Sequence, residues 1–226
     1  MATDLAHIDV WIFDLDNTLY PPGAEFITLM ENRMTDFVAR ETGLPRTDAR
    51  ALQKTYLHEH GTTLAGLMAN HGVPPEPFLT EVHDVSMDSL KPDAGLRDAI
   101  ARLPGRRLVF TNGDARHADR VLAHLGLDHL FEAVFHIAAA DYIPKPRPEA
   151  FRRMVARHEV DPGAAAFFED SERNLEPAAA LGMTTVLVGP AAADSAAPFV
   201  HHRTSDLAAF LNSAVVHEPT VRRIDR

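Results

Sequence analysis

Five short apolar runs are spaced along the chain, and each predicts a buried strand. They cover residues 8–13, 107–110, 132–137, 165–169 and 184–188. The runs are rich in β-branched and aromatic residues and nearly continuous rather than alternating, which is typical of strands covered on both faces. Such strands occur mainly in parallel sheets flanked by helices. The pattern therefore predicts a parallel sheet buried between two helical layers.

Helical periodicity accompanies the last four of these runs. Residues 94–103 precede the second run, and residues 115–125, 148–157 and 174–181 fill the later gaps; a further helix is expected near 205–213. Strands that alternate with helices of this length are the mark of βαβ units. The fold class expected is therefore α/β, a doubly wound, Rossmann-like parallel sheet.

The stretch between the first and second runs is far longer than the roughly 30 residues of one βαβ unit. Residues 21–90 hold amphipathic helical patterns at 25–41, 46–59, 63–70 and 75–85, separated by glycine and proline. We interpret them as a helical domain inserted after the first strand, with 1–20 and 91–216 forming the α/β core. The alternative is that these helices only thicken the core. Residues 217–226 are expected to be a frayed tail.

Composition narrows the possible partners. The chain has 226 residues, no cysteine and a formal net charge of −10. Nucleic-acid polymers and anionic membranes need a basic footprint, so we expect neither as a partner. Disulfides and thiolate chemistry are excluded. The first apolar run is too short for a secretion signal, and no segment has the roughly 18 apolar residues of a spanning helix, so a cytoplasmic location is expected. The oligomeric state stays open.

Polar residues follow four of the predicted strands, at the point where each strand ends. In open α/β sheets, ligands bind beyond the carboxyl ends of the strands. Groups that are distant along the chain are therefore expected to converge there. They are Asp14 and Asp16 after the first strand, Thr111, Asn112 and Gly113 after the second, Lys145 after the third, and Glu169 and Asp170 after the fourth.

Carboxylates gathered this closely cannot all stay ionised without a cation, because their mutual repulsion would force protons onto them. Lys145 supplies one positive charge, and a divalent metal ion would supply the rest. Hard oxygen ligands, with no Cys or His close by in the pattern, favour Mg²⁺ over zinc. The sequence thus predicts a Mg²⁺ cofactor held among Asp14, Asp16, Glu169 and Asp170.

Together, these segments resemble the four motifs of the haloacid dehalogenase-like (HAD) hydrolase superfamily. The motifs are Asp14-Leu15-Asp16-Asn17-Thr18-Leu19, Thr111-Asn112-Gly113, Lys145-Pro146 and Glu169-Asp170-Ser171. They occur in the right order and at the expected strand ends. A lone pair of acids would carry little weight, whereas four motifs placed by independent strand predictions form a specific signal.

The resemblance implies a role for each residue. Asp14 would be the nucleophile that forms an aspartyl phosphate, and Asp16 the general acid and then the base. Lys145 would neutralise the nucleophile and the phosphate. Thr111 and the amide of Asn112, with Gly113, would bind the phosphate group. Asp14, the backbone carbonyl of Asp16, and Asp170 would hold Mg²⁺; Glu169 would touch the metal directly, reach it through water, or orient Lys145.

Asp16 also favours phosphate esters, since family members that cleave carbon–halogen bonds lack the second aspartate. The helical insert resembles a C1-type cap, and residues 10–188 resemble the pyrimidine 5′-nucleotidase branch, which implies UMP or CMP as substrates. Base or ribose contacts are expected at Asn112, Gly113, Tyr56, His60, Asp114 and Arg116, with packing between cap helices as the alternative for Tyr56 and His60. His201 and His202 are predicted to lie in a polar loop.

The same residues are compatible with three other functions. The first is a phosphatase for a sugar phosphate or phosphoglycolate. The second is a phosphomutase, which would return the phosphoryl group from Asp14 to a sugar. The third is a binding protein that kept the fold and lost turnover; the complete set of Asp14, Asp16, Thr111, Lys145 and Asp170 argues against it.

Overall fold

The computed structural model of the chain describes residues 3–23 and 25–216; the tail predicted at 217–226 lies outside them. Within these residues a six-stranded sheet has the order β3-β2-β1-β4-β5-β6, and every neighbouring pair is parallel. The strands are β1 (Val10–Phe13), β2 (Arg106–Phe110), β3 (Ala133–Phe135), β4 (Ala165–Glu169), β5 (Thr184–Val188) and β6 (His202–Thr204). The predicted α/β doubly wound fold is confirmed.

Helices cover both faces of this sheet. Successive residues of a strand point to opposite faces, so each strand contributes side chains to both helical layers. In β1, Trp11 and Phe13 belong to one buried apolar cluster, whereas Val10 and Ile12 belong to the other. The first cluster takes in α5 (Ala94–Ala101), α6 (Ala115–Leu125) and α9 (Leu207–Ser213); the second takes in α7 (Pro148–His158) and α8 (Glu172–Ala180). Two covered faces explain why the strand runs read as continuously apolar.

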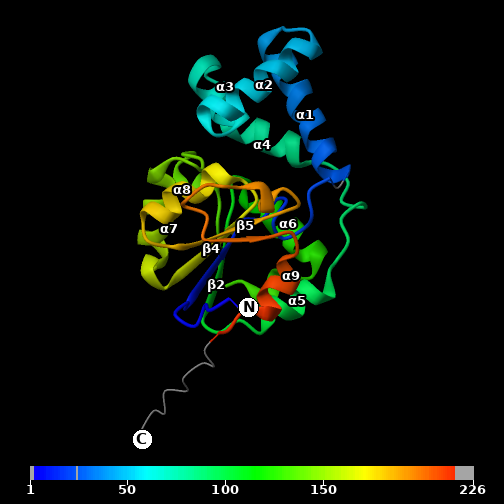
Figure 1. Ribbon diagram of the computed structural model, residues 1–226. Coiled ribbons are helices and arrows are strands. Elements are labelled where there is room, and N and C mark those ends of the chain that lie inside the picture. The colour runs from blue at the N-terminus through cyan, green and yellow to red at the C-terminus, as the bar shows by residue number, and fades with distance from the viewer. Residues whose placement is uncertain (1–2, 24, 217–226) are drawn as a thin grey trace, which may run out of the picture.

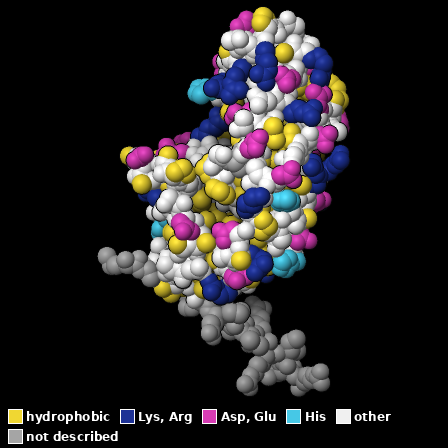
Figure 2. All heavy atoms as spheres, turned by 90° about the vertical axis from the view of Figure 1, so that its right-hand side faces the viewer, with side chains coloured by type: hydrophobic (Ala, Val, Ile, Leu, Met, Phe, Trp, Pro, Cys, Tyr) yellow, Lys and Arg dark blue, Asp and Glu magenta, His cyan; other side chains and the backbone are white. Residues whose placement is uncertain are grey.

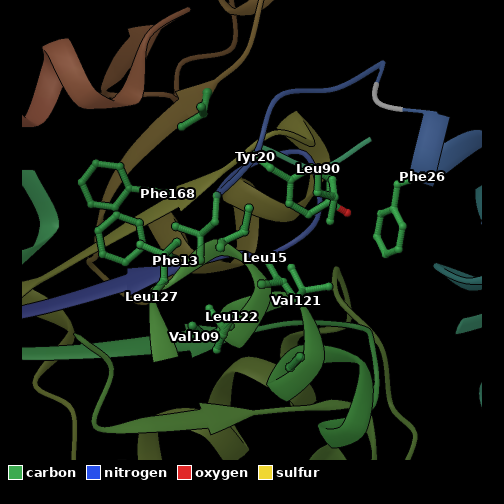
Figure 3. Packing of buried hydrophobic residues seen from close by; sticks show 14 of the residues in the cluster. Phe13, Leu15, Tyr20, Phe26, Leu90, Val109, Val121, Leu122, Leu127 and Phe168 are labelled. Atoms are coloured by element: carbon green, nitrogen blue, oxygen red, sulfur yellow. The ribbon is translucent and has the colours of Figure 1, made fainter. Parts of the chain in front are cut away.

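Aromatic side chains form much of the first cluster (Figure 3). The rings of Phe13 and Phe168, on the adjacent strands β1 and β4, stack with their centroids 4.6 Å apart. An aromatic pair of this kind contributes about 0.5–1.5 kcal/mol beyond the burial of its surface. Leu15, which lies just past β1, is fully buried in the same cluster. This packing anchors the segment that carries Asp14 and Asp16.

Five helices lie between β1 and β2; α5 packs on the sheet, and the first four form a separate layer above it (Figure 1). Their own apolar residues hold them together; Phe37 and Phe78, for example, pack edge to face with centroids 5.1 Å apart. A buried hydrogen bond of 2.6 Å from Thr35 Oγ1 to Gln53 Oε1 joins the first two of these helices. The helices are α1 (Glu25–Thr42), α2 (Arg46–His60), α3 (Thr63–His71) and α4 (Pro75–His83).

Charges of both signs are mixed over the surface of these insert helices (Figure 2). Several form ion pairs, such as Arg40 with Glu81 at 2.8 Å and Arg46 with Asp36 at 2.7 Å. These side chains are largely exposed, so each pair contributes at most about 1 kcal/mol. The apolar contacts between the helices therefore supply most of the stability of the insert. In the described part of the chain, no helix combines the length and the apolar character that crossing a membrane requires.

Element boundaries differ from the sequence prediction mainly at chain turns. The first strand begins at Val10 rather than residue 8, because the sheet pairing of β1 with β2 starts at Val10 and Arg106. The third strand ends at Phe135 rather than residue 137, because a 3₁₀ turn, Ile137–Ala140, follows it. The helix α6 has the bounds predicted from its periodicity. Local apolar pattern thus located the elements but not the residues at which backbone hydrogen bonding stops.

The predicted polar loop is confirmed at His201, which lies outside any strand, but is wrong at His202. His202 begins β6, which pairs with β5 from Val186 onward, and Thr185 N donates to His201 Nδ1 over 3.0 Å. This edge strand has three residues, each only partly buried, so no apolar run marks it in the sequence. Pairing with β5, rather than side-chain burial, is what defines it.

Candidate active site

The polar residues predicted at the strand ends meet at a single cavity of about 540 Å³. It lies between the carboxyl edge of the sheet and the helical insert, since residues of both line it. The strand-end residues that line it are Asp14, Asp16, Thr111, Asn112, Gly113, Lys145, Glu169 and Asp170. The parallel sheet brings together every one of these side chains, as expected from the position of ligand sites in open α/β folds.

The segment after β1 turns sharply once the strand ends. Asp14 N still donates to Phe168 O at 2.9 Å, which continues the pairing with β4 one residue further. Asn17 then has a φ of 64°, in the left-handed region that asparagine tolerates better than most residues. Leu19 N donates back to Leu15 O at 3.0 Å and closes the turn. With Leu15 buried below, Asp14 and Asp16 both line the cavity.

Lys145 is at the centre of the acidic cluster and is 1 % exposed. Its Nζ donates to Asp14 Oδ1 at 2.6 Å, to Glu169 Oε2 at 2.8 Å and to Phe110 O at 2.8 Å. These bonds use all three donors of the ammonium group. Burial alone would lower the pKa of Lys145, but the charges of Asp14 and Glu169 raise it above its ordinary value. Lys145 is therefore a permanent cation beside the Asp14 carboxylate.

Three carboxylates in this cluster form a candidate metal site. One oxygen from each of Asp14, Glu169 and Asp170 lies within 4.8 Å of the others. Burial and the charge of Glu169 raise the pKa of Asp14 to about 7, and the same two causes raise the pKa of Asp170 to about 9. The single positive charge of Lys145 therefore does not balance the negative charge of the carboxylate cluster. A hard divalent cation would fit this all-oxygen donor set and restore the ionised carboxylates.

Metal removal is expected to make stability fall with rising pH. Asp14 and Asp170 have raised pKa values, so the folded state binds more protons than the unfolded chain between about pH 4 and pH 9. In EDTA, the melting temperature should therefore drop by several degrees between about pH 5 and pH 9. Added Mg²⁺ should raise it again, and most at high pH, where its ligands are deprotonated. Differential scanning calorimetry across this pH range measures both effects.

Asp170→Asn should reduce this response to Mg²⁺, because it removes one carboxylate of the site. Glu172→Gln is the matched control, since Glu172 is exposed on the adjacent first turn of α8 and lies outside the carboxylate cluster. An equal response to Mg²⁺ in wild type and Asp170→Asn would contradict a metal site at this cluster.

Asn112, the second residue after β2, holds the loop of Lys145 in place. Asn112 Nδ2 donates to Lys145 O at 3.2 Å, and Lys145 N donates to Asn112 Oδ1 at 2.9 Å. The side chain of Asn112 is thus engaged with the backbone of Lys145. Thr111 Oγ1, buried, accepts from Gly113 N at 2.9 Å. At Gly113 a Cβ atom would lie 2.8 Å from His117 Cδ2, so only glycine leaves room for this imidazole.

Two side chains that the sequence analysis did not identify bind Asp16. Tyr20 OH donates to Asp16 Oδ1 at 2.6 Å, and His117 Nε2 lies 2.8 Å from the same oxygen. A carboxylate can only accept, so Nε2 carries the proton in this bond. The spacing of Asp16 and Tyr20, four residues apart on a turn, was a detectable signal. His117 is 101 positions away, and no local pattern links the two.

These contacts decide the charge of Asp16. Burial alone would raise the pKa of Asp16, but the charge and hydrogen bond of His117, with the hydroxyl of Tyr20, lower it to about 2. Burial would likewise lower the pKa of His117, whereas the charge of Asp16 raises it. Burial and Asp16 both raise the pKa of Tyr20. The carboxylate of Asp16 is therefore ionised at neutral pH, next to two proton donors.

The insert supplies the other wall of the cavity, and that wall is largely apolar. Its apolar lining residues are Ile27, Met30, Met34, Leu57, Leu64, Phe78 and Leu79. Its polar groups include Lys54 and His58 of α2, and Arg173 of α8 also reaches this side. Arg173 Nη2 donates to Gly61 O at 3.2 Å, which ties the turn after α2 to the core. No strand-end pattern could have identified these residues.

Four residues expected to contact the base or ribose do not line this cavity. Tyr56 is buried against Gly66 between insert helices, and its hydroxyl is 2.8 Å from His71 Nε2, while His60 packs edge to face on Tyr56. The packing alternative therefore holds for Tyr56 and His60. Asp114 and Arg116 line a second cavity of about 280 Å³ instead. Asp114 caps the N-terminus of α6 and Arg116 lies in its first turn, so both face this second cavity.

Comparisons with known proteins agree with this geometry. A family model described as "haloacid dehalogenase-like hydrolase" matches residues 8–182. Phosphate metabolism protein 8 of Saccharomyces cerevisiae is 29 % identical over 194 residues, which cover 79 % of this chain and 60 % of the yeast protein. Fructose-1-phosphate phosphatase YqaB of Escherichia coli is 37 % identical over 109 residues, 46 % of this chain and 56 % of the relative. The matched segments therefore span less than two thirds of both relatives.

Among solved structures, the HAD phosphatase from Thermococcus onnurineus has the same architecture, with a TM-score of 0.61. The match covers 92 % of this chain and 99 % of that one, at 19 % identity. At this level of identity the likeness concerns the fold.

Proposed function

Because the chain belongs to the haloacid dehalogenase-like hydrolase family, we propose that it is a Mg²⁺-dependent phosphatase that works through an aspartyl phosphate. The observation that carries the proposal is the contact of buried Lys145 with Asp14 at 2.6 Å, beside Asp16 at the same cavity. We further propose that residues 21–90 act as a cap over a core formed by 1–20 and 91–216. Such a cap would exclude water and contact the leaving group.

In the first step, a carboxylate oxygen of Asp14 bonds to phosphorus while the bond from phosphorus to the ester oxygen breaks. The proton of Asp16 goes to that oxygen, so an alcohol leaves and Asp14 carries the phosphate. Asp16 is ionised when the cavity is empty, but the negative charge of a bound phosphate raises its pKa and favours its acid form. Lys145 offsets the charge that accumulates around the phosphorus.

In the second step, water attacks the phosphorus of the aspartyl phosphate. Asp16, now a carboxylate, takes a proton from this water, and the bond between phosphorus and Asp14 breaks. Phosphate leaves, and Asp14 is regenerated. The ionised state of Asp16, which His117 and Tyr20 stabilise, suits it to act as this base.

Mg²⁺ fits the donor set on which the mechanism depends. Asp14, Asp170 and the backbone carbonyl of Asp16 would hold it, and it would supply positive charge next to the transferred phosphoryl group. Both oxygens of Glu169 already accept hydrogen bonds, from Lys145 Nζ at 2.8 Å and from Ser171 N at 3.1 Å. We therefore propose that Glu169 orients Lys145, one of the three roles considered for it, from its place in the carboxylate cluster. Thr111 Oγ1 accepts from Gly113 N and keeps its own proton, which it can donate to the phosphate.

We propose pyrimidine nucleoside 5′-monophosphates, UMP or CMP, as substrates, on the resemblance of residues 10–188 to the pyrimidine 5′-nucleotidase branch. The cavity supports a leaving group with an apolar surface, because Met30, Phe78 and Leu79 line the wall formed by the insert. A flat pyrimidine ring would cover such a surface, whereas a polyol would leave it unmatched. The substrate therefore is a small phosphorylated metabolite, with a nucleotide favoured.

A second candidate rests on the similarity to a fructose-1-phosphate phosphatase at 37 % identity. In this case Lys54, His58 and Arg173, the polar groups on the same side of the cavity, would bind sugar hydroxyls. The residues at the strand ends would keep the roles that they have in the two steps described above.

Phosphate release from a substrate panel decides between the two. UMP, CMP, dUMP, AMP, GMP, 2-phosphoglycolate, fructose 1-phosphate and other hexose phosphates are assayed with Mg²⁺ and with EDTA. We expect the highest kcat/KM for UMP or CMP, with the activity lost in EDTA. A preference for fructose 1-phosphate would keep the mechanism and replace the substrate.

The same assay tests the remaining alternatives. Free phosphate that appears in step with loss of a sugar phosphate excludes a phosphomutase, because a mutase returns the phosphoryl group to the sugar. Release of phosphate from none of the substrates, in protein shown by calorimetry to be folded, would contradict the phosphatase and favour a binding protein.

A further inference from the structure

His117 lies on α6, which is part of the core, but its ring packs against two rings of the insert. It stacks on His83, at the end of α4, with centroids 4.1 Å apart, and lies parallel to Phe26, at the start of α1, at 5.9 Å. Figure 3 shows Phe26 at this junction, just after the insert begins. His117 is 1 % exposed. The imidazole is therefore held where the chain enters and leaves the insert.

Polar contacts tie α6 to the same junction. His83 Nδ1 is 3.0 Å from Asp114 Oδ2, and Arg120 Nη1 donates to His83 O at 2.8 Å. Phe26 N donates to Ser89 Oγ at 2.9 Å, which joins the two connecting segments of the insert. Movement of the insert over the core would therefore disturb the surroundings of His117 directly.

Both donors to Asp16 converge on one of its oxygens. Tyr20 OH and His117 Nε2 bind Oδ1, at 2.6 and 2.8 Å, and within residues 3–23 and 25–216 no donor binds Oδ2. The carboxylate is thus held from one side, and its second oxygen stays available in the cavity that Asp16 lines. A histidine with only a structural role would also need a hydrogen-bond partner for Nε2. Here that partner is Asp16, the proposed acid and base of the reaction.

We propose that His117 is a positioning residue, which holds Asp16 by Oδ1 so that Oδ2 meets the leaving oxygen, and which takes its own position from Phe26 and His83 of the insert. The inference rests on the proposed phosphatase function. In this role, His117 couples the position of the insert to the position of the Asp16 carboxylate. His117 touches neither phosphate nor leaving group; it acts through the Asp16 carboxylate alone.

Leaving-group dependence separates this role from a general structural one. An alkoxide needs a proton from Asp16 to depart, whereas p-nitrophenolate leaves without one. The value of kcat/KM covers the steps up to loss of the leaving group, and so reports its protonation. His117→Phe keeps a ring in the stack and removes the donor. We expect kcat/KM for the preferred alkyl phosphate ester of the panel to fall about tenfold or more, and kcat/KM for p-nitrophenyl phosphate to change less than about twofold.

Two further variants make the test specific. His117→Gln keeps an N–H donor and should recover a large part of the loss, because it positions Asp16 without an imidazole. His124→Ala is the matched control. This exposed histidine of α6 binds Leu90 O instead of Asp16, so its removal should leave kcat/KM for both substrates unchanged. In an Asp16→Asn background, adding His117→Phe should have no further effect on the alkyl ester.

Equal losses for the two substrates in His117→Phe, or no loss for either, would overturn the positioning role while leaving the phosphatase intact. A Gln variant that is folded and as impaired as the Phe variant would also overturn it. If wild-type protein hydrolyses neither substrate, the proposed function itself fails.

Discussion

Asp14→Asn is expected to lower phosphate release by at least about 10⁴-fold, because it replaces the nucleophilic carboxylate by an amide that cannot form the aspartyl phosphate. Stability should change little, since the amide oxygen can still accept the hydrogen bond from Lys145 Nζ. In EDTA near pH 8, the melting temperature of the variant should equal or exceed that of wild type. The pKa of Asp14 is raised to about 7, so its ionised form destabilises the metal-free protein above that pH.

Steady-state kinetics, calorimetry and acid quenching test this expectation together. Quenched wild-type protein should carry covalent phosphate, and the variant should carry none. Asp9→Asn is the matched control, because Asp9 precedes β1 at its other end and is exposed; it should leave turnover and melting temperature unchanged. Turnover retained in Asp14→Asn would disprove the assignment of the nucleophile.

Lys145→Met should remove both activity and stability. The substitution keeps an unbranched side chain but removes the ammonium group that contacts buried Asp14 and Glu169. Removing one partner from a buried ion pair costs about 3–5 kcal/mol in free energy of unfolding. For a chain of this size that corresponds to a fall in melting temperature of roughly 6–20 °C.

The loss should depend on pH in a defined direction. The charge of Lys145 lowers the pKa of Asp14, so its removal raises that pKa further above the unfolded value. The variant should therefore be closest to wild type near pH 5, where the carboxylates take up protons, and furthest from it near pH 8–9. Lys91→Met is the control, since Lys91 is exposed and bonds only to Asp88 O. A stability difference that stays constant with pH would show that the cluster does not depend on the charge of Lys145.

The strand ends were predictable because two local signals were enough to find them. Continuous apolar runs located β1, β2 and β4, and the polar residues that follow, such as Asp14, Thr111 and Asp170, had to share one edge once the sheet was parallel. Leu15, between two acids, was predictable as a core residue from the alternation of an extended segment. These inferences need only the periodicity of the sequence and the rule that ligand sites lie at the carboxyl ends of parallel strands.

Contacts between helices were not predictable in the same way. Tyr56 and His60 lie on α2 beside cavity-lining residues, yet the rotation of that helix turns Tyr56 toward His71. The edge strand β6 has no apolar run, and its pairing with β5 is visible only in three dimensions. The first case depends on the orientation of a predicted helix, and the second on a strand too short and too exposed for an apolar run to mark it.

The amino-acid sequence alone determined the α/β class, the family and the set of charged residues at the strand ends, because each follows from a short pattern and its order along the chain. Only the tertiary structure decided that Lys145 Nζ donates to Asp14, Glu169 and Phe110 O at the same time, and that His117 holds Asp16. The physical reason is distance along the chain. His117 lies 101 positions from Asp16, so their contact depends on how α6 packs beside the turn after β1, and no local periodicity records that packing.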